Sequence, residues 1–357
     1  MHRRALLALA ASSLALTGLG IPAHADEVRI TGPIVHENLA IYPIHGKSSA
    51  GPVPLTLDEA LAKRAVKVHE TGTVSELQIE NLGGDEVFVQ SGDIVKGGQQ
   101  DRVLSVSLML PPKSGRIPIA AFCVERGRWT ARGKEDARTF ATASAVVPSR
   151  EAKLAIRAVP AEGAPVRTNP LAGGNPSGIR TGYAAEPSPQ QQVWDRVQKL
   201  QDNLKESLGA SVAAPASQSS LQLSLENEKL KDAQDAYLKV LTQEGEKDGD
   251  IVGFAFAVNG KLNSAEIYPS NGLFRKMWPK LLQAAVTEAI GGKNADSDAP
   301  PTSDAALAFV TDAMNGQSSE RPLPAKLSVE TRQADNAIYV ESRRANGAWV
   351  HRSYVAK

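Results

Sequence analysis

The sequence predicts an α+β protein whose first half is rich in strands and whose second half is rich in helices. Short β-branched runs separated by Gly, Pro, Asn and Asp turns fill the first half. Apolar residues at three- and four-residue steps follow in the second half, and a Pro-, Gly- and Ala-rich stretch separates the two. We therefore expect an N-terminal antiparallel β-sandwich or partly open barrel, followed by a helical hairpin, a β-hairpin and a packed helix.

The N-terminus has the pattern of a secretory signal peptide covering residues 1–25. Arg3 and Arg4 precede an uncharged apolar run over residues 5–19, and Ala-His-Ala at residues 23–25 supplies a small-x-small cleavage site. The run is shorter than the ~20 residues that a membrane-spanning helix needs. We expect cleavage after Ala25, a periplasmic or secreted mature chain, and no integral membrane segment once the signal is removed.

Charge and cysteine content narrow the classes of partner and of fold. The chain of 357 residues has 40 Lys and Arg against 39 Asp and Glu, and loss of Arg3 and Arg4 with the signal leaves 38 against 39. Such a balance argues against nucleic acid, which requires clustered basic excess. The single Cys123 excludes an internal disulfide. We expect a small molecule or a protein as partner.

Residues 26–159 form the predicted β-rich half, with strands over residues 86–90, 102–110 and 117–124. Polarity differs between alternate residues of the run 102–110, so we expect one half-buried strand with Ser107 on its less apolar face. One helix interrupts the strands, because Thr56 and Glu59 form the sequence pattern of a capping box.

The composition of residues 160–187 predicts a flexible linker or loop, and residues 188–292 are expected to form the helical half of the same domain. Ser188 followed by Pro189 marks a helix start, and a second helix over 225–241 would pack against the first as a hairpin. The remaining expected elements are a β-hairpin at Asn259-Gly260, a helix over 273–290 kinked or broken by Pro279, and, in the tail 293–357, a helix over 304–314 and strands over 326–331, 337–343 and 349–355.

The densest polar cluster lies between residues 91 and 102 and combines acids, bases, amides and glycines. Glycines allow a backbone to approach a ligand, although hairpin turns use the same residue types for geometric reasons. Together with a second polar run at 125–129, this cluster predicts a ligand- or partner-binding surface. Its candidate residues are Asp93, Lys96, Gln99, Gln100, Asp101, Arg102, Glu125, Arg128 and Trp129.

Other chemistries receive weaker support from the sequence. An alternative is a hydrolase of an anionic or polar envelope substrate, with Asp93, Asp101 or Glu125 as acid and base. Lys96 or Arg102 would hold the substrate. A third possibility is a structural envelope protein. Cys123 is expected to be a buried core thiol rather than a nucleophile. The scattered histidines match no metal-binding pattern, so we expect neither a metal nor a cofactor.

Several strings of the sequence resemble one known family. They are residues 88–102, 111–115 and 122–129, with further matches at 192–194, 253–260 and 273–282. The chain is similar there to the ARG and Rhodanese-Phosphatase-superfamily-associated protein domain, over about residues 30 to 292. The resemblance implies one continuous domain across the linker and transfers no mechanism. The leading functional expectation is therefore a non-catalytic binding or accessory module of the cell envelope.

Overall fold

The computed structural model describes residues 28–157 and 187–357, except for the side chains of residues 142–144. The predicted signal peptide and nearly all of the predicted linker lie outside the described residues. Helices and strands mix along the described chain in three sheets and several helices, so the predicted α+β class is confirmed. No helix among the described residues combines the length and the apolarity that a bilayer crossing requires.

The first half of the chain builds a barrel-like sheet that is nearly closed. Its strands, in spatial order, are β12 (Phe140–Val146), β8 (Asp93–Gly97), β9 (Arg102–Leu104), β11 (Gly115–Cys123), β6 (Glu76–Asn81) and β5 (Val66–Glu70). An isolated antiparallel bridge between His69 and Thr139 joins the two outer strands. Helix α1 (Leu57–Ala62) begins at the predicted capping box, in which Thr56 and Glu59 bond each other's backbone N–H groups. The expected partly open barrel is confirmed.

The single strand predicted over residues 102–110 is wrong. The run contributes β9 to the barrel-like sheet and β10 (Leu108–Leu110) to a separate sheet with β7 (Val87–Val89) and β4 (Leu55–Thr56). At the junction, Ser105 N donates to Ala120 O at 3.0 Å, and Ser107 Oγ accepts from Ser91 N at 2.9 Å. Backbone pairing with β11 thus continues to Ser105, the Ser107 hydroxyl satisfies the Ser91 N–H, and the chain passes from one sheet to the other.

The longest sheet joins the two ends of the chain. Its path is β1 (Arg29–Ile30), β3 (Leu39–His45), β13 (Ile251–Val258), β14 (Lys261–Ile267), β18 (Trp349–Ala356), β17 (Ala337–Arg344), β16 (Leu327–Gln333) and β15 (Gln317–Leu323), and β2 (Ile34–His36) pairs with β3. The β13–β14 hairpin turns at Asn259 and Gly260, whose φ angles are 51° and 75°, as the Asn-Gly pair predicts. The sequence did not predict β15 or the pairing of β3 with β13.

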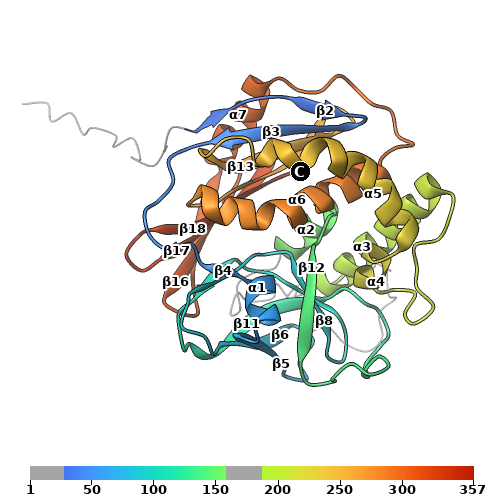
Figure 1. Ribbon diagram of the computed structural model, residues 1–357, viewed down its shortest axis with the longest axis vertical. Helices are drawn as coiled ribbons and strands as arrows, with labels where there is room; N and C mark the ends of the chain where they lie inside the picture. The colour runs from blue at the N-terminus through green and yellow to red at the C-terminus, as the bar shows by residue number, and fades with distance from the viewer. Residues whose placement is uncertain (1–27, 158–186) are drawn as a thin grey trace, which may run out of the picture.

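Both faces of the long sheet are buried, because side chains of β3 and β13 alternate between two cores. Ile41 and Phe254 face one core, whereas Tyr42 and Ala255 face the other. Helix α6 (Asn271–Gly291) packs on the first face and also contacts β12 and β4, so it lies between the long sheet and the barrel-like sheet (Figure 1). Helix α7 (Ser303–Ala313) packs against β1, β14 and β17. One helix therefore holds the two sheets together.

The remaining helices refine the predicted pattern. Helix α3 (Pro189–Leu208) starts after the Ser188 cap as expected. The predicted helix over 225–241 is present as α5 (Glu228–Leu241), which begins three residues later because Asn227 caps it, and a short unpredicted helix, α4 (Leu221–Leu225), precedes it. Both α3 and α5 contact α6 more extensively than each other. Pro279 does not break α6. Helix α2 (Arg150–Arg157) was not predicted.

Candidate functional site

The predicted cluster folds into a buried network of ion pairs. The side chains of Asp101 and Glu125 have no exposed surface. Arg132 reaches both carboxylates, at 3.0 Å from Asp101 Oδ2 and 3.4 Å from Glu125 Oε1, and Arg128 Nη2 lies 2.7 Å from Glu125 Oε2. Burial alone would raise the pKa of Glu125, but hydrogen bonds from Arg128 and Ser217 lower it overall. The Glu125 carboxylate is therefore ionised, and both carboxylates are paired with the protein's own arginines.

The second half of the chain supplies part of this network. Ser220, which caps α4, donates its hydroxyl to Asp101 Oδ2 at 2.7 Å. The backbone N–H of Gly97 donates to Asp101 Oδ1 at 2.9 Å. Asp101 thus accepts bonds from both halves of the chain, which indicates that it fixes the position of α4 on the barrel-like sheet.

Three further predicted residues lie at the edge of the network. Arg102 is fully buried and donates to Gln100 O at 2.9 Å, and Gln100 Nε2 donates to Glu125 O at 2.9 Å. Trp129 is 43% exposed, and its ring lies 5.5 Å from the guanidinium carbon of Arg102. Trp129 is therefore the member of this group that presents the largest apolar surface to solvent.

The other predicted residues take separate partners. Lys96 pairs with Glu226 at 2.7 Å, and Asp93 pairs with Lys280 of α6 at 2.6 Å. The backbone N–H of Gln99 points to Glu70 at 3.4 Å. Asp93 and Lys96 thus pair with residues outside the network. The predicted residues that lie together are Gln100, Asp101, Arg102, Glu125, Arg128 and Trp129. Four prominent cavities occur among the described residues, and none of these four is lined by a predicted site residue.

Cys123 is a core residue, which confirms its interpretation from the sequence. Its side chain is completely buried at the end of β11. Burial raises the pKa of the thiol to about 11. A thiol with this pKa is almost wholly protonated at neutral pH and makes a poor nucleophile.

One cavity of about 360 Å³ combines hydroxyl, guanidinium and apolar groups, and its size lies in the range of small-molecule sites. We call it the serine cavity. It lies between the barrel-like sheet, the strands β15 to β17, the end of α2 and the start of α3. Its polar lining includes Ser75, Ser91, Ser105, Ser107, Arg157, Ser188, Gln190, Arg321 and Thr331, and its apolar lining includes Phe122, Ile156, Val329 and Val340.

Arg157, the last residue of α2, brings a positive charge to this cavity. Its Nη2 donates to the hydroxyl of Ser353, whereas Nη1 is buried without a hydrogen-bond partner among the described residues. Burial lowers the pKa of Arg157, and the nearby Glu266 carboxylate opposes this effect. An unsatisfied buried guanidinium donor is costly, and a carboxylate or a phosphate oxygen would satisfy it.

Ser107 connects the serine cavity to two buried titratable side chains. Its Oγ lies 2.9 Å from Nδ1 of His351 on β18, and Nε2 of that ring lies 3.1 Å from Oε2 of Glu266 on β14. The three residues are 5%, 2% and 3% exposed. Burial alone would raise the pKa of Glu266, but His351, Lys153 and Arg157 lower it overall, so the carboxylate is ionised at neutral pH.

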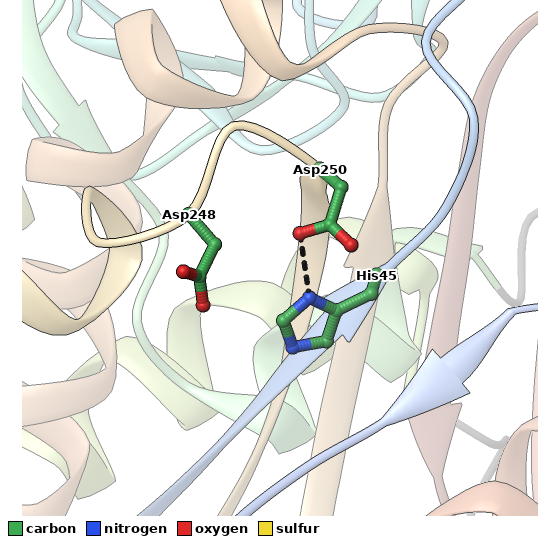
Figure 2. A group of neighbouring side chains, drawn as sticks. All are labelled: His45, Asp248 and Asp250. Carbon is green, nitrogen blue, oxygen red and sulfur yellow. Dashed lines mark hydrogen bonds and ion pairs between the residues drawn. The ribbon is translucent and has the colours of Figure 1, made fainter.

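A second group of titratable side chains lies at the far end of β3. Figure 2 shows His45 facing Asp248 and Asp250, and the candidate ligand atoms of the three lie within 4.8 Å of one another. Both ring nitrogens are already engaged, Nδ1 with Asp250 at 2.8 Å and Nε2 with Thr31 at 2.9 Å. The two aspartates are exposed. This arrangement favours a hydrogen-bonded histidine that anchors the loop before β13.

The sequence did not point to the serine cavity. Ser107 was expected on a strand face, His351 was grouped with scattered histidines, and Arg157 lay in no expected helix. The usable signal was the pair Ser105 and Ser107 inside an otherwise apolar run, because two hydroxyls in a buried strand require partners. Those partners are 244 positions away in the case of His351, and no local pattern predicts such a contact.

The comparisons with known proteins identify the family. The model of the ARG and Rhodanese-Phosphatase-superfamily-associated protein domain matches residues 27–355, and the chain belongs to this family. The match includes the tail after residue 292, which supplies β15 to β18 and hence His351. The comparison with curated proteins and the comparison with solved structures each gave no match.

Proposed function

We propose that this protein is an exported ligand-binding module and that it holds a small molecule with an anionic group in the serine cavity. The supporting observation is Arg157 Nη1, a buried donor that lacks a hydrogen-bond partner among the described residues. Arg157 lines the cavity together with several hydroxyl groups and apolar side chains that include Phe122 and Val340. Such a lining suits a ligand that has one carboxylate or phosphate and a short apolar body.

A thermal-shift experiment on the mature protein tests this proposal. Inorganic phosphate, acetate, butyrate and succinate serve as probes, and wild type is compared with Arg157→Gln and with Arg150→Gln. Arg150 is the first residue of the same helix and does not line the serine cavity. We expect at least one anion to raise the melting temperature of wild type and of Arg150→Gln by mass action and to leave Arg157→Gln unchanged. Equal responses from all three proteins would contradict the proposal.

Export is the second part of the proposal and rests on residues 1–25. The basic start, the apolar run and the Ala-His-Ala site support it. Fractionation of bacterial cells that express the full chain, followed by N-terminal sequencing, provides the test. We expect the mature form to begin at Asp26 and to appear outside the cytoplasm, and an unprocessed cytoplasmic chain would contradict export.

The surface around Trp129 is a second candidate binding site, for a protein partner. The exposed indole lies over Arg102, at the edge of a rigid ion-pair network, and aromatic side chains on rigid supports are common interface anchors. We expect Trp129→Ala to keep the wild-type melting temperature and to lose chemical cross-links to envelope proteins. Unchanged cross-links in that variant would remove this candidate.

A further inference from the structure

Ser107, His351 and Glu266 form a chain of polar contacts that ends at the serine cavity. Ser107 lies at the junction between β9 and β10, His351 on β18 and Glu266 on β14. Only the serine lines the cavity, while the ring and the carboxylate lie behind it. A hydroxyl at the cavity wall is thus linked through one imidazole to one buried carboxylate, and this order is the one that nucleophilic serine chemistry requires.

The surrounding hydrogen bonds fix the direction of proton donation. The backbone N–H of Ser91 donates to Ser107 Oγ at 2.9 Å. One lone pair of the hydroxyl is therefore occupied, and its proton is free to face Nδ1 of His351. Because Nε2 faces the ionised Glu266 at 3.1 Å, we assign the ring proton to Nε2. Nδ1 is then the basic nitrogen that faces the hydroxyl.

The imidazole ring is held in place by packing. Its centroid lies 4.9 Å from the ring of Tyr268 and 5.6 Å from that of Phe88. Tyr268 donates its hydroxyl to Gln90 at 2.6 Å and so does not compete for the imidazole. Neither His351 Nε2 nor Glu266 Oε2 has an aligned hydrogen-bond partner among the described residues, so their 3.1 Å contact acts as an ion pair when the ring is protonated.

The backbone of Ser107 is hydrogen-bonded to β17, the strand that pairs with β18 beside His351. Ser342 of β17 pairs with His351 of β18 and donates its hydroxyl to Ser107 O at 2.7 Å. The serine is thus bound to the long sheet through its backbone and through its side chain. The distance between nucleophile and base is set by strand pairing, which is a rigid support for a reacting pair.

Buried serine and histidine side chains also occur as plain structural networks, in which each polar atom is satisfied internally. Two observations distinguish this chain of contacts. Its serine lines a cavity of about 360 Å³, and the same cavity is lined by Arg157, whose buried Nη1 has no hydrogen-bond partner among the described residues. A hydroxyl that is backed by a base and a cationic side chain therefore line the same cavity.

We propose that Ser107 is the nucleophile of an ester-hydrolysing site in the serine cavity, with His351 as its base and Glu266 as the positioning residue. This inference rests on the proposed function, because the substrate occupies the same cavity. The substrate class is a small ester whose acyl chain lies against Phe122 and Val340, and the product carboxylate faces Arg157.

The reaction balances without a cofactor. Ser107 Oγ attacks the ester carbonyl carbon as its proton passes to His351 Nδ1. The bond to the leaving alcohol breaks, and the alcohol takes that proton from Nδ1, which leaves an acyl group on Ser107. A water molecule then attacks the acyl carbon, gives its proton to Nδ1, and the acid departs as Ser107 Oγ recovers the proton. Glu266 stabilises the imidazolium and stays ionised throughout.

Active-site labelling tests the proposal directly. The mature protein is incubated with diisopropyl fluorophosphate, and the modified peptide is mapped by mass spectrometry. We expect one diisopropylphosphorylated residue, Ser107, with labelling lost in Ser107→Ala and retained in Ser297→Ala, which changes an exposed serine outside the cavity. Labelling elsewhere, or none, would overturn the proposal. The wild-type map decides the question even if Ser107→Ala fails to fold.

Hydrolysis of p-nitrophenyl butyrate supplies the second readout. We expect Ser107→Ala to lower kcat/KM by at least about 100-fold, the scale of loss for a nucleophile, while Ser297→Ala matches wild type. Glu266→Gln should lower kcat by about the same factor and retain the thermal shift with butyrate, because a positioning residue does not bind the ligand. If anions bind but Ser107 is not labelled, only the assignment of Ser107 as the nucleophile is overturned. Absence of both would overturn the cavity proposal as well.

Discussion

Ser107 Oγ lies 2.9 Å from Nδ1 of His351, although 244 positions separate the two residues. The contact exists because β9 and β10 belong to different sheets and the junction between them touches β18. It joins the barrel-like sheet to the C-terminal end of the long sheet. The same junction forms one wall of the serine cavity.

The ion-pair network around Arg132 should dominate the stability of the barrel-like sheet. Its side chain is 9% exposed and reaches the two fully buried carboxylates of Asp101 and Glu125. Arg132→Met leaves these charges undercompensated, so we expect the free energy of unfolding to fall by about 3–5 kcal/mol. Urea denaturation gives the value. The matched control is Arg138→Met, whose side chain is 91% exposed, and it should keep the wild-type midpoint. A difference below about 1 kcal/mol between the two variants would refute this role.

Acid should destabilise the protein partly through Glu125. Its pKa in the folded state is lowered despite burial, chiefly by hydrogen bonds from Arg128 and Ser217. The unfolded chain therefore binds the proton more readily than the folded chain. The stabilisation is complete above the unfolded glutamate pKa of about 4.3 and is lost as pH falls through the lower folded pKa. We expect Glu125→Gln to flatten the fall in the urea midpoint below about pH 4.3, while the exposed Glu320→Gln keeps the wild-type slope. Identical slopes would exclude Glu125 as a source of the acid sensitivity.

Gly253 allows β13 to approach β14 closely at the strand that carries Glu266. A Cβ at this position would lie 2.3 Å from the backbone oxygen of Glu266, so Gly253→Ala must displace that strand. We expect a loss of about 1–3 kcal/mol in the free energy of unfolding, the usual cost of overpacking. Gly249→Ala is the control, because a Cβ there meets nothing within 4 Å. Equal thermal melts for the two variants would show that β14 adjusts freely.

The same substitution reports on the proposed chemistry. Displacement of Glu266 should lower the rate of p-nitrophenyl butyrate hydrolysis in Gly253→Ala more than in Gly249→Ala. The rate is measured well below the melting temperature, where both variants are fully folded. A rate that follows stability alone would indicate that the position of Glu266 is unimportant to turnover.

The sequence predicted those elements whose cause is local. The Thr56 and Glu59 capping box, the Ser188 cap of α3 and the Asn259-Gly260 turn each depend on residues within a few positions of one another. The partly open barrel followed from the spacing of strands and turns. The charged cluster was also identified from its composition, and the structure shows that most of its side chains pair with one another.

The secondary-structure predictions failed where a local sequence pattern was consistent with more than one tertiary arrangement. The run 102–110 alternates as one strand would, yet both faces of β9 and β10 are buried, so alternation could not reveal the break. The helix expected over 225–241 begins only at Glu228, because Asn227 caps it. Periodicity reports which residues are apolar, and it does not report which sheet a strand joins.

The sequence by itself determined the α+β class, the main helices, the hairpin turn and the family, because each depends on residue patterns that persist along the chain. Only the tertiary structure decided that β3 pairs with β13, that Asp101 and Glu125 are neutralised by Arg128 and Arg132, and that Ser107 meets His351. These contacts join residues far apart in the chain. Their geometry is set by strand pairing and by the need to satisfy buried polar groups, and both take effect when the chain is folded.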